Sequence, residues 1–321
     1  MMKIDNIQFT DLHPSLVDFK AEVLNGLATQ PKTIPPKFFY DQHGSQLFDR
    51  ITELPEYYPT RTEIAILQEH GEEMALLLGK ERWLLELGSG SNKKIRVLLN
   101  ALQPATYLPI DISKEHLLQS AQALATDFPK LKIHAICADY SSDFQLPCSN
   151  IPNEKRVAFF PGSSIGNFEP SQAQDLLRRV AKLLGPKGAL LIGVDLKKAP
   201  NLLHAAYNDA QGVTAAFNLN LLSRLNRELE ADFKPTHFEH YAFYNVELGR
   251  VEMHLVSKIS QEIQVAGQKF TFAEGESIHT ENSCKYTVTQ FQNLAKAVGF
   301  QPEKVWVDAA KLFSVHCLRV N

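Results

Sequence analysis

Cysteine is scarce in this sequence, and its four cysteines lack the C-x-x-C spacing of a zinc or redox site. The four are Cys137, Cys148, Cys284 and Cys317. Their scatter is typical of reduced thiols in a cytoplasmic protein and excludes a disulfide scaffold. No run approaches the roughly 20 apolar residues that span a bilayer, and the N-terminus has no apolar core of a signal peptide. The sequence therefore predicts neither a membrane protein nor a secreted one.

An excess of basic residues is also missing, because the formal net charge is −3. Nucleic-acid-binding surfaces carry clustered positive charge, so a polynucleotide partner is disfavoured. With 321 residues, 44% of them hydrophobic and 21% charged, the chain has the composition of a globular protein with a large core. A polynucleotide substrate is therefore the weaker expectation, no membrane association is expected, and no obligate protein partner is inferred.

What the sequence does contain is a strand, a glycine turn and a helix in direct succession. Trp83 to Leu87 is a short apolar run of the kind that forms a buried parallel strand. Gly88-Ser-Gly90 follows, and an apolar helical face begins at Ile95. The third glycine of a dinucleotide fingerprint is absent, as is the Gly-Lys-Ser/Thr ending of a phosphate loop, so NAD, FAD and nucleoside triphosphates are disfavoured.

An acidic residue ends the next expected strand, 106–110, at Asp111. It lies about 20 residues beyond the turn, the spacing of a ribose-binding carboxylate. Together with the E-x-G-x-G sequence of residues 86–90, it looks like the corner of an S-adenosylmethionine (SAM) methyltransferase. The alternative is an ordinary strand–helix turn beside a surface aspartate.

Strands and helices alternate regularly from residue 83 to about 195, with further strands expected at 132–137, 156–161 and 189–194. In a parallel sheet, ligands collect beyond the carboxyl ends of the strands. Five residues fall at such ends and predict one shared site: Gly88, Asp111, Asp139, Asn167 and Asp195. Two last strands, 302–307 and 313–319, would complete a seven-stranded Rossmann-like sheet with helices on both faces.

Two segments do not follow this alternation. Residues 1–62 contain a helical face at 16–27 and then a stretch rich in aromatics and prolines, which we interpret as a lid; the alternative is simple packing of its aromatic rings. Residues 197–286 contain helices and then antiparallel strands, and we expect a substrate-binding α+β insertion. The SAM-binding core would then be 63–196, with 287–321 returning to its sheet.

Several motifs together resemble the histidine-specific Nα-methyltransferases of ergothioneine biosynthesis. They are Lys37-Phe-Phe-Tyr-Asp41, Gly44-Ser45, Leu47-Phe48, residues 54–63, Glu86-Leu-Gly-Ser-Gly90, residues 161–168 and Thr280-Glu-Asn-Ser-Cys-Lys-Tyr286. They cover nearly the whole chain in the family's order. The resemblance implies a cytoplasmic enzyme that uses SAM to trimethylate the α-amino group of L-histidine, giving hercynine.

The resemblance also implies the cofactor-binding residues. They are Tyr40, Gly88, Lys94, Asp111, Asp139 and Tyr140. The family usually has phenylalanine where Tyr140 stands, which keeps the stacking face, and Asn92 and Lys93 replace the commoner Ser-Glu.

For the substrate, Tyr57, Glu281 and Ser283 resemble the residues that hold the imidazole. Asn167 and Tyr207 resemble those that hold the carboxylate and amine, and Met253 an apolar contact. Tyr40 and Asn167 are the catalytic candidates, expected to orient the amine lone pair.

Other functions stay open at this point. The same chemistry could act on another amino acid or on a tryptophan derivative, and a SAM-binding regulator or a nucleic-acid methyltransferase would keep the fold. His237-x-x-His240 has no further ligand at zinc spacing, so no metal is expected.

Overall fold

The computed structural model describes residues 7–12, 16–90, 92–142, 146 and 151–321. The chain divides into two compact units. Unit 1 contains residues 1–13, 59–198 and 284–321, and unit 2 contains residues 14–58 and 199–283. Cys148 lies outside the described residues, and the other three cysteines are free and buried, as predicted.

Unit 1 is built on an eight-stranded sheet in the order β1-β5-β4-β3-β6-β7-β14-β13. Its strands are β1 (Ile7–Leu12), β3 (Trp83–Leu87), β4 (Thr106–Asp111), β5 (Lys132–Ala138), β6 (Arg156–Phe160), β7 (Ala189–Asp195), β13 (Phe300–Val307) and β14 (Phe313–Val320). All neighbouring pairs are parallel except those of β14, which runs antiparallel to β7 and β13. The predicted α/β fold is confirmed, with one strand more than expected.

The additional strand is β1, which pairs in parallel with β5 at the edge of the sheet. Its side chains are exposed or only partly buried, and Phe9 is 37% exposed. An edge strand with so little buried surface lacks the apolar run by which central strands are recognised.

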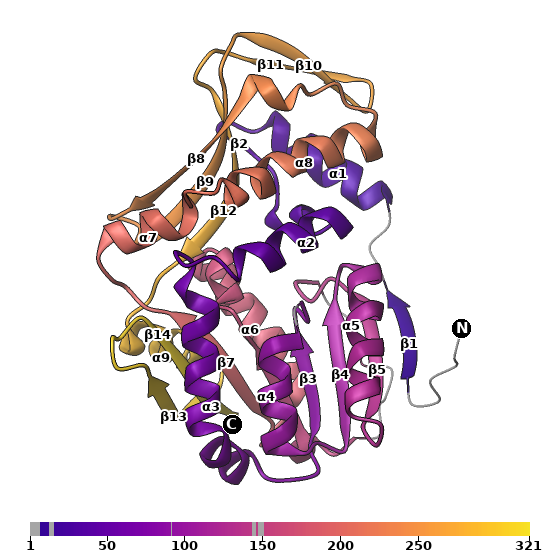
Figure 1. The fold of residues 1–321 in the computed structure, drawn as a ribbon, viewed down its shortest axis with the longest axis vertical. Coiled ribbons are helices and arrows are strands. Elements are labelled where there is room, and N and C mark those ends of the chain that lie inside the picture. Colours follow the sequence, from indigo (N-terminus) through magenta and orange to yellow (C-terminus); the bar gives the residue numbers. More distant parts are fainter. Residues whose placement is uncertain (1–6, 13–15, 91, 143–145, 147–150) are drawn as a thin grey trace. The chain divides into compact units, whose positions relative to one another are not determined.

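Helices cover both faces of this sheet (Figure 1). One apolar core joins the sheet to α3 (Tyr58–Leu78), α4 (Asn92–Leu102) and α5 (Lys114–Asp127). The other joins its opposite face to α6 (Pro170–Leu184) and α9 (Val288–Lys296). Because both faces are buried, the central strands are almost wholly apolar.

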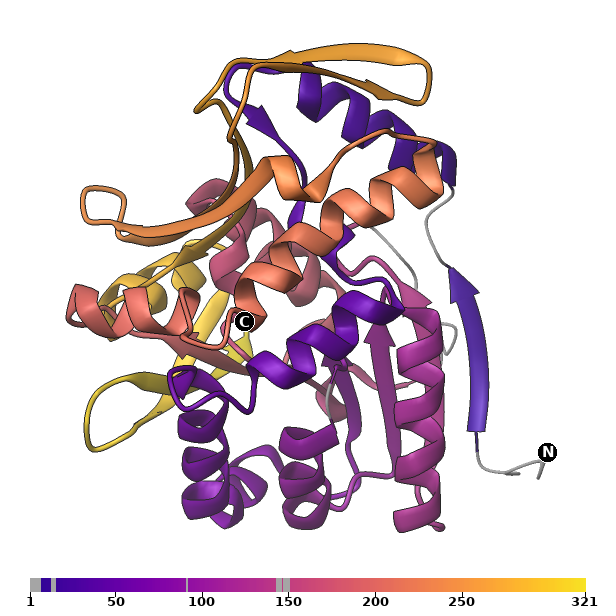
Figure 2. The same cartoon turned by 45° about the horizontal axis from the view of Figure 1, so that its top comes forward.

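Unit 2 contains a four-stranded sheet in the order β2-β12-β9-β8 and a separate β10–β11 hairpin. Its strands are β2 (Lys32–Thr33), β8 (Phe238–Asn245), β9 (Arg250–Ser257), β10 (Gln261–Val265), β11 (Gln268–Phe272) and β12 (Ser277–Cys284). Its helices are α1 (Leu16–Ala28), α2 (Gln42–Ile51), α7 (Pro200–Tyr207) and α8 (Val213–Leu229). Helix α8 packs against both α2 and β8–β9 (Figure 2), burying Phe217, Leu221 and Leu225.

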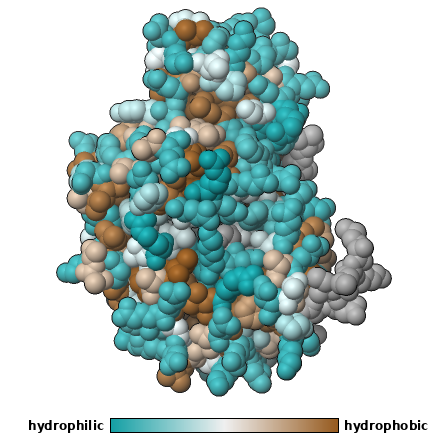
Figure 3. Space-filling view, in the orientation of Figure 1, coloured by the Kyte–Doolittle hydropathy of each residue, from teal (hydrophilic) through white to brown (hydrophobic). Residues whose placement is uncertain are grey.

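No helix among the described residues is long and apolar enough to cross a membrane. Hydrophilic residues dominate the face shown in Figure 3, where hydrophobic residues form only scattered patches.

Candidate active site

The residues that sequence analysis placed at strand ends lie there in unit 1. Gly88 follows β3, Asp111 ends β4, Asp139 follows β5 and Asp195 ends β7. Asn167 ends a short 3-10 turn, Ser164–Asn167, that follows β6. Because these five strands are parallel, the five residues share one edge of the sheet, as predicted.

The glycine turn passes directly beneath an aromatic ring. Gly88 has φ +74°, and a Cβ built on it would lie 3.5 Å from Cε1 of Tyr140. The Tyr140 ring is braced edge-on by Phe160, with ring centroids 5.4 Å apart. No described atom lies within 4 Å of a Cβ built on Gly90. The turn thus offers bare backbone beside a flat ring, which fits the close approach and stacking of an adenosyl group.

Two carboxylates flank this turn. Asp111 Oδ1 accepts a hydrogen bond of 2.8 Å from the Ser113 backbone N–H, and Asp139 Oδ1 accepts one of 2.8 Å from Ser141. Burial raises the pKa of Asp111 to about 6, although the Ser113 bond opposes this shift. A partly buried carboxylate with acceptor capacity is suited to ribose hydroxyl donors, which would stabilise its ionised form. These two acceptors fit the hydroxyl and amino groups that SAM offers as donors.

Glu86, immediately before the turn, forms a buried network that the sequence did not predict. Tyr107 donates a hydrogen bond to Glu86 Oε2, and Ser89 Oγ lies 3.1 Å from the Tyr107 oxygen. Burial raises the pKa of Glu86 to about 7, against the opposing effect of the Tyr107 hydrogen bond. The network connects β3 and β4 to the glycine turn at the cofactor edge.

The raised pKa of Glu86 predicts a pH-dependent stability. Below about pH 4.5 the carboxyl is neutral in the folded and unfolded chain alike. Between pH 4.5 and 7 the unfolded chain ionises first, so the wild type loses stability that Glu86→Gln keeps. We expect the unfolding free energy of Glu86→Gln, relative to wild type, to rise by about 3 kcal/mol across this range. Urea unfolding at a series of pH values measures it, and a pH-independent difference would contradict it.

A second buried carboxylate that the sequence did not assign is Glu63 of α3, which is 0% exposed. Its Oε2 lies 2.7 Å from Lys94 Nζ and accepts a hydrogen bond of 2.9 Å from the backbone N–H of Gly162. A Cβ on Gly193 of β7 would come within 2.1 Å of Glu63 Oε1, so only glycine fits there. Glu63 therefore connects α3 to the helix after the glycine turn and to the loop after β6. Lys94 is thus paired with Glu63, and its contact with the cofactor stays a prediction.

The carboxylate of Asp195 forms ion pairs with two lysines. It lies 2.5 Å from Lys198 Nζ and 2.7 Å from Lys285 Nζ, and all three side chains are buried. Burial lowers the pKa of Lys198 to about 8. Because each oxygen of its carboxylate is paired with a lysine, we interpret Asp195 as a residue of the scaffold at this edge.

In unit 2, Tyr40 belongs to an aromatic cluster. Its ring lies edge-on to Phe48 and to Phe217, at centroid distances of 5.7 and 5.8 Å, and Phe48 also contacts Tyr57 at 6.3 Å. The structure thus brings together Tyr40 and Tyr57, which the sequence predicted for cofactor and substrate. It also adds Phe48, which lies in the Leu47-Phe48 motif but had no role assigned, and Phe217, which lies in none of the quoted motifs.

Asp41, next to Tyr40, fixes this segment. Its Oδ1 accepts hydrogen bonds from Gly44 N (2.7 Å) and Asn220 Nδ2 (2.9 Å), and its Oδ2 pairs with Arg227 at 2.6 Å. Asp41 therefore caps α2 and ties it to α8.

Two predicted substrate residues of unit 2 are in direct contact. The Tyr207 hydroxyl donates a 2.7 Å hydrogen bond to Ser283 Oγ, and both side chains are buried. Met253, 2% exposed, lies on β9, and partly buried Glu281 lies on β12 two residues before Ser283. The family resemblance assigns Tyr207 and Ser283 to different parts of the substrate and does not imply the hydrogen bond between them.

Comparison with known proteins gives several similarities. A family model described as histidine-specific methyltransferase, SAM-dependent, matches residues 19–320. A histidine N-alpha-methyltransferase of Mycolicibacterium smegmatis is 40% identical over 92% of this chain and 93% of its own length. Ergothioneine biosynthesis protein 1 of Neurospora crassa is 33% identical over 86% of this chain and 32% of its own length. A 4-dimethylallyltryptophan N-methyltransferase of Claviceps purpurea is 25% identical over 89% of this chain and 90% of its own length.

Proposed function

We propose that this chain, which belongs to the family of histidine-specific, SAM-dependent methyltransferases, trimethylates the α-amino nitrogen of L-histidine. The product would be hercynine, and the reaction the first step of ergothioneine synthesis. The observation that carries the histidine assignment is the buried hydrogen bond between Tyr207 and Ser283, two residues from Glu281.

This arrangement suits a neutral imidazole. Ser283 accepts from Tyr207, yet its hydroxyl still carries a proton that can be donated to an imidazole nitrogen. The Glu281 carboxylate can accept the N–H of the other nitrogen. An indole has one donor and no acceptor, so it would leave the Ser283 hydroxyl unmatched. The pair therefore favours histidine over a tryptophan derivative of the kind named for the Claviceps relative.

Except for Tyr40 of unit 2, the residues proposed to contact the cofactor are in unit 1. Asp111 would hold the ribose hydroxyls, Asp139 and Tyr140 the adenine, and Gly88 would admit the methionine part against its backbone. Bound SAM supplies a methyl group on a positively charged sulfur, already activated for displacement by an amine. No covalent intermediate with the protein is needed, so alignment and exclusion of water are what the residues contribute.

Tyr40 and Asn167 are proposed to orient the amine lone pair toward the methyl group. Tyrosine has an unperturbed pKa of about 10 and is a poor proton acceptor at neutral pH. We therefore assign deprotonation of the amine between methylation rounds to solvent. Tyr57 and Met253 are proposed to pack against the histidine side chain, and Tyr207 to position Ser283.

A set of three acceptors tests the site of methylation. Incubated with SAM, L-histidine should gain methyl groups, whereas Nα-acetylhistidine and imidazole propionate, which lack a free α-amine, should gain none. Fragmentation of the product by tandem mass spectrometry should place every methyl on the α-nitrogen. Methylation of either analogue, or of an imidazole nitrogen, would overturn the proposal.

A further inference from the structure

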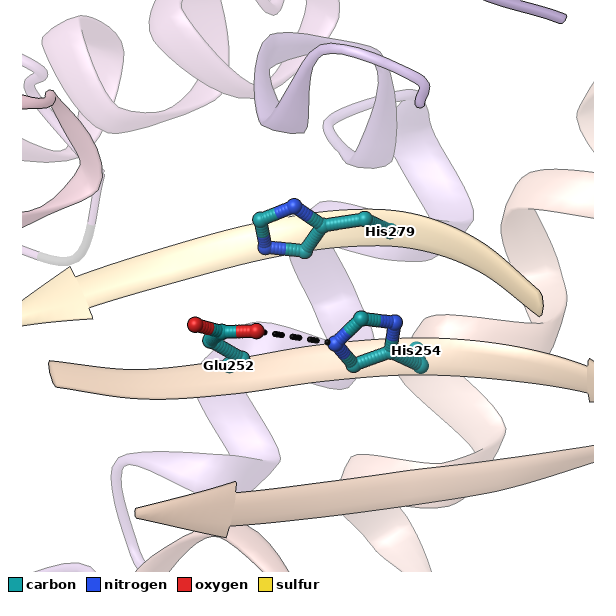
Figure 4. Close-up of side chains that lie close together, drawn as sticks. All are labelled: Glu252, His254 and His279. Carbon is teal, nitrogen blue, oxygen red and sulfur yellow. Dashed lines mark hydrogen bonds and ion pairs between the residues drawn. The ribbon is translucent and has the colours of Figure 1, made fainter. Parts of the chain in front are cut away.

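Three side chains of unit 2 that the proposed reaction does not use point toward one another: Glu252 and His254 on β9, and His279 on β12 (Figure 4). Each offers a ligand atom, and these atoms all lie within 4.8 Å of one another. The three residues are here called the HEH cluster. Two imidazoles and a carboxylate form a donor set that divalent transition metals accept.

The HEH cluster faces away from the helices of unit 2. The β8–β9 register sets Tyr241 opposite His254 and Phe243 opposite Glu252, so these four side chains share one face of the sheet. Tyr241 on this face is 53% exposed, whereas Met253 on the other face is 2% exposed. The ligands themselves are less accessible than Tyr241, because Glu252 is 7% exposed and His254 and His279 are partly buried.

The two rings are held in a stack. His254 lies between Phe243 and His279, with ring centroids 5.7 and 4.8 Å away and interplanar angles of 19° and 16°. The Nδ1 atom of His254 lies 3.2 Å from Ser277 Oγ, and Nε2 of His279 donates to the Glu281 carbonyl at 3.1 Å. Metal-binding histidines are oriented by such outer hydrogen bonds.

The carboxylate is oriented as well. Glu252 Oε1 accepts hydrogen bonds from Arg250 Nε (2.8 Å) and Asn245 Nδ2 (3.1 Å). The other oxygen, Oε2, faces Nε2 of His254 at 3.2 Å. Arg250 and Asn245 thus fix one oxygen and leave the other directed at an imidazole.

We propose that the HEH cluster binds one divalent transition-metal ion, with Zn²⁺ as the representative, through Glu252, His254 and His279. Zinc takes nitrogen and oxygen ligands at about 2.0–2.2 Å, so its ligand atoms lie roughly 3.4 Å apart. Closing the largest separation, at most 4.8 Å, to that value requires the side chains to move by about 1.4 Å in total. A fourth position stays open to water. The ion would connect β9 to β12, the strands that carry Met253 and Ser283.

Two other histidines of unit 2, His237 and His240, make different contacts. Both ring nitrogens of His240 are engaged, by Asn218 and by the Tyr207 carbonyl, and His237 Nδ1 lies 3.2 Å from Gln261. His237 is therefore a matched control in the same unit.

The test uses tag-free full-length protein stripped with a chelator, titrated calorimetrically with Zn²⁺ in the absence of free histidine, which itself chelates metal. Wild type and His237→Gln should bind one equivalent and unfold at a higher temperature with Zn²⁺ than without it. Glu252→Gln, His254→Gln and His279→Gln should each bind at least about 10-fold more weakly.

Glu252→Gln is the variant expected to disturb the fold least, because it replaces the carboxylate by an amide and keeps the size of the side chain. Circular dichroism of each metal-free variant shows whether it is folded, and Co²⁺ absorption gives a second readout. Saturable binding that is equal in wild type and in the folded variants would overturn the proposal, as would the absence of saturable binding to wild type. Neither result would affect the methyltransferase assignment, which does not depend on the metal.

Discussion

Replacing Glu63 with alanine is expected to lower the free energy of unfolding by about 3–5 kcal/mol, because the change leaves the Lys94 ammonium without its buried partner. Lys94 is only 14% exposed, so solvent cannot replace the lost carboxylate well. The Gly162 backbone N–H loses its acceptor as well. Chemical denaturation of wild type and Glu63→Ala measures the effect. The affinity for SAM should fall with it, since α4 and the loop after β6 both lose their anchor at the cofactor edge.

The double variant Glu63→Gln/Lys94→Met distinguishes a charge effect from a packing effect. It removes both charges, so it should be more stable than Glu63→Ala alone. Asp175→Ala is the matched control, because the Asp175–Arg178 pair is exposed, and it should change stability by no more than about 0.5 kcal/mol. A loss of less than about 1 kcal/mol in Glu63→Ala would contradict the role given to this carboxylate.

Glu281→Ala is expected to reduce kcat/KM for histidine by about 100-fold or more, because an imidazole N–H would then enter a partly buried position without its acceptor. Ser283→Ala should have a similar effect on the other ring nitrogen and should also leave the Tyr207 hydroxyl without the acceptor seen here. Steady-state kinetics with histidine at saturating SAM measure both losses.

The affinity for SAM separates a substrate effect from a general one. It should stay unchanged in Glu281→Ala and Ser283→Ala, since neither residue is among those proposed to contact the cofactor. Glu239→Gln, an exposed glutamate on β8 of the same unit, should keep wild-type kinetics. If Glu281→Ala retained full kcat/KM for histidine, another residue would hold the imidazole.

Most of unit 1 could be predicted because its buried strands carry a strong pattern. Continuous apolar runs such as Trp83–Leu87 and Ala189–Asp195 gave the strands, and glycines and acids at their ends gave the cofactor edge. The family resemblance drawn from the motifs is confirmed by the match over residues 19–320.

Helices α2 and α3 were not expected. Their first turns fall in a segment rich in prolines and aromatics, which we interpreted as a lid. The apolar spacing of α3, with Ile66, Leu67, Met74 and Leu78 buried, is helical and could have indicated it. The partners of Glu63 could not be found this way, because Lys94 and Gly162 are brought to it only by the fold.

The HEH cluster illustrates the same limit. Glu252 and His254 are two residues apart, but His279 joins them only because β12 lies beside β9. The sequence instead indicated His237 and His240, whose ring nitrogens the structure commits elsewhere. Ligands from different strands cannot be recognised before the strand order is known.

The most direct test of the proposed function is mass spectrometry of purified protein incubated with SAM and each of the twenty amino acids separately. We expect L-histidine alone to gain three methyl groups, with S-adenosylhomocysteine formed in a threefold molar amount. Trimethylation of another amino acid in place of histidine, or no methylation despite measurable SAM binding, would contradict the account.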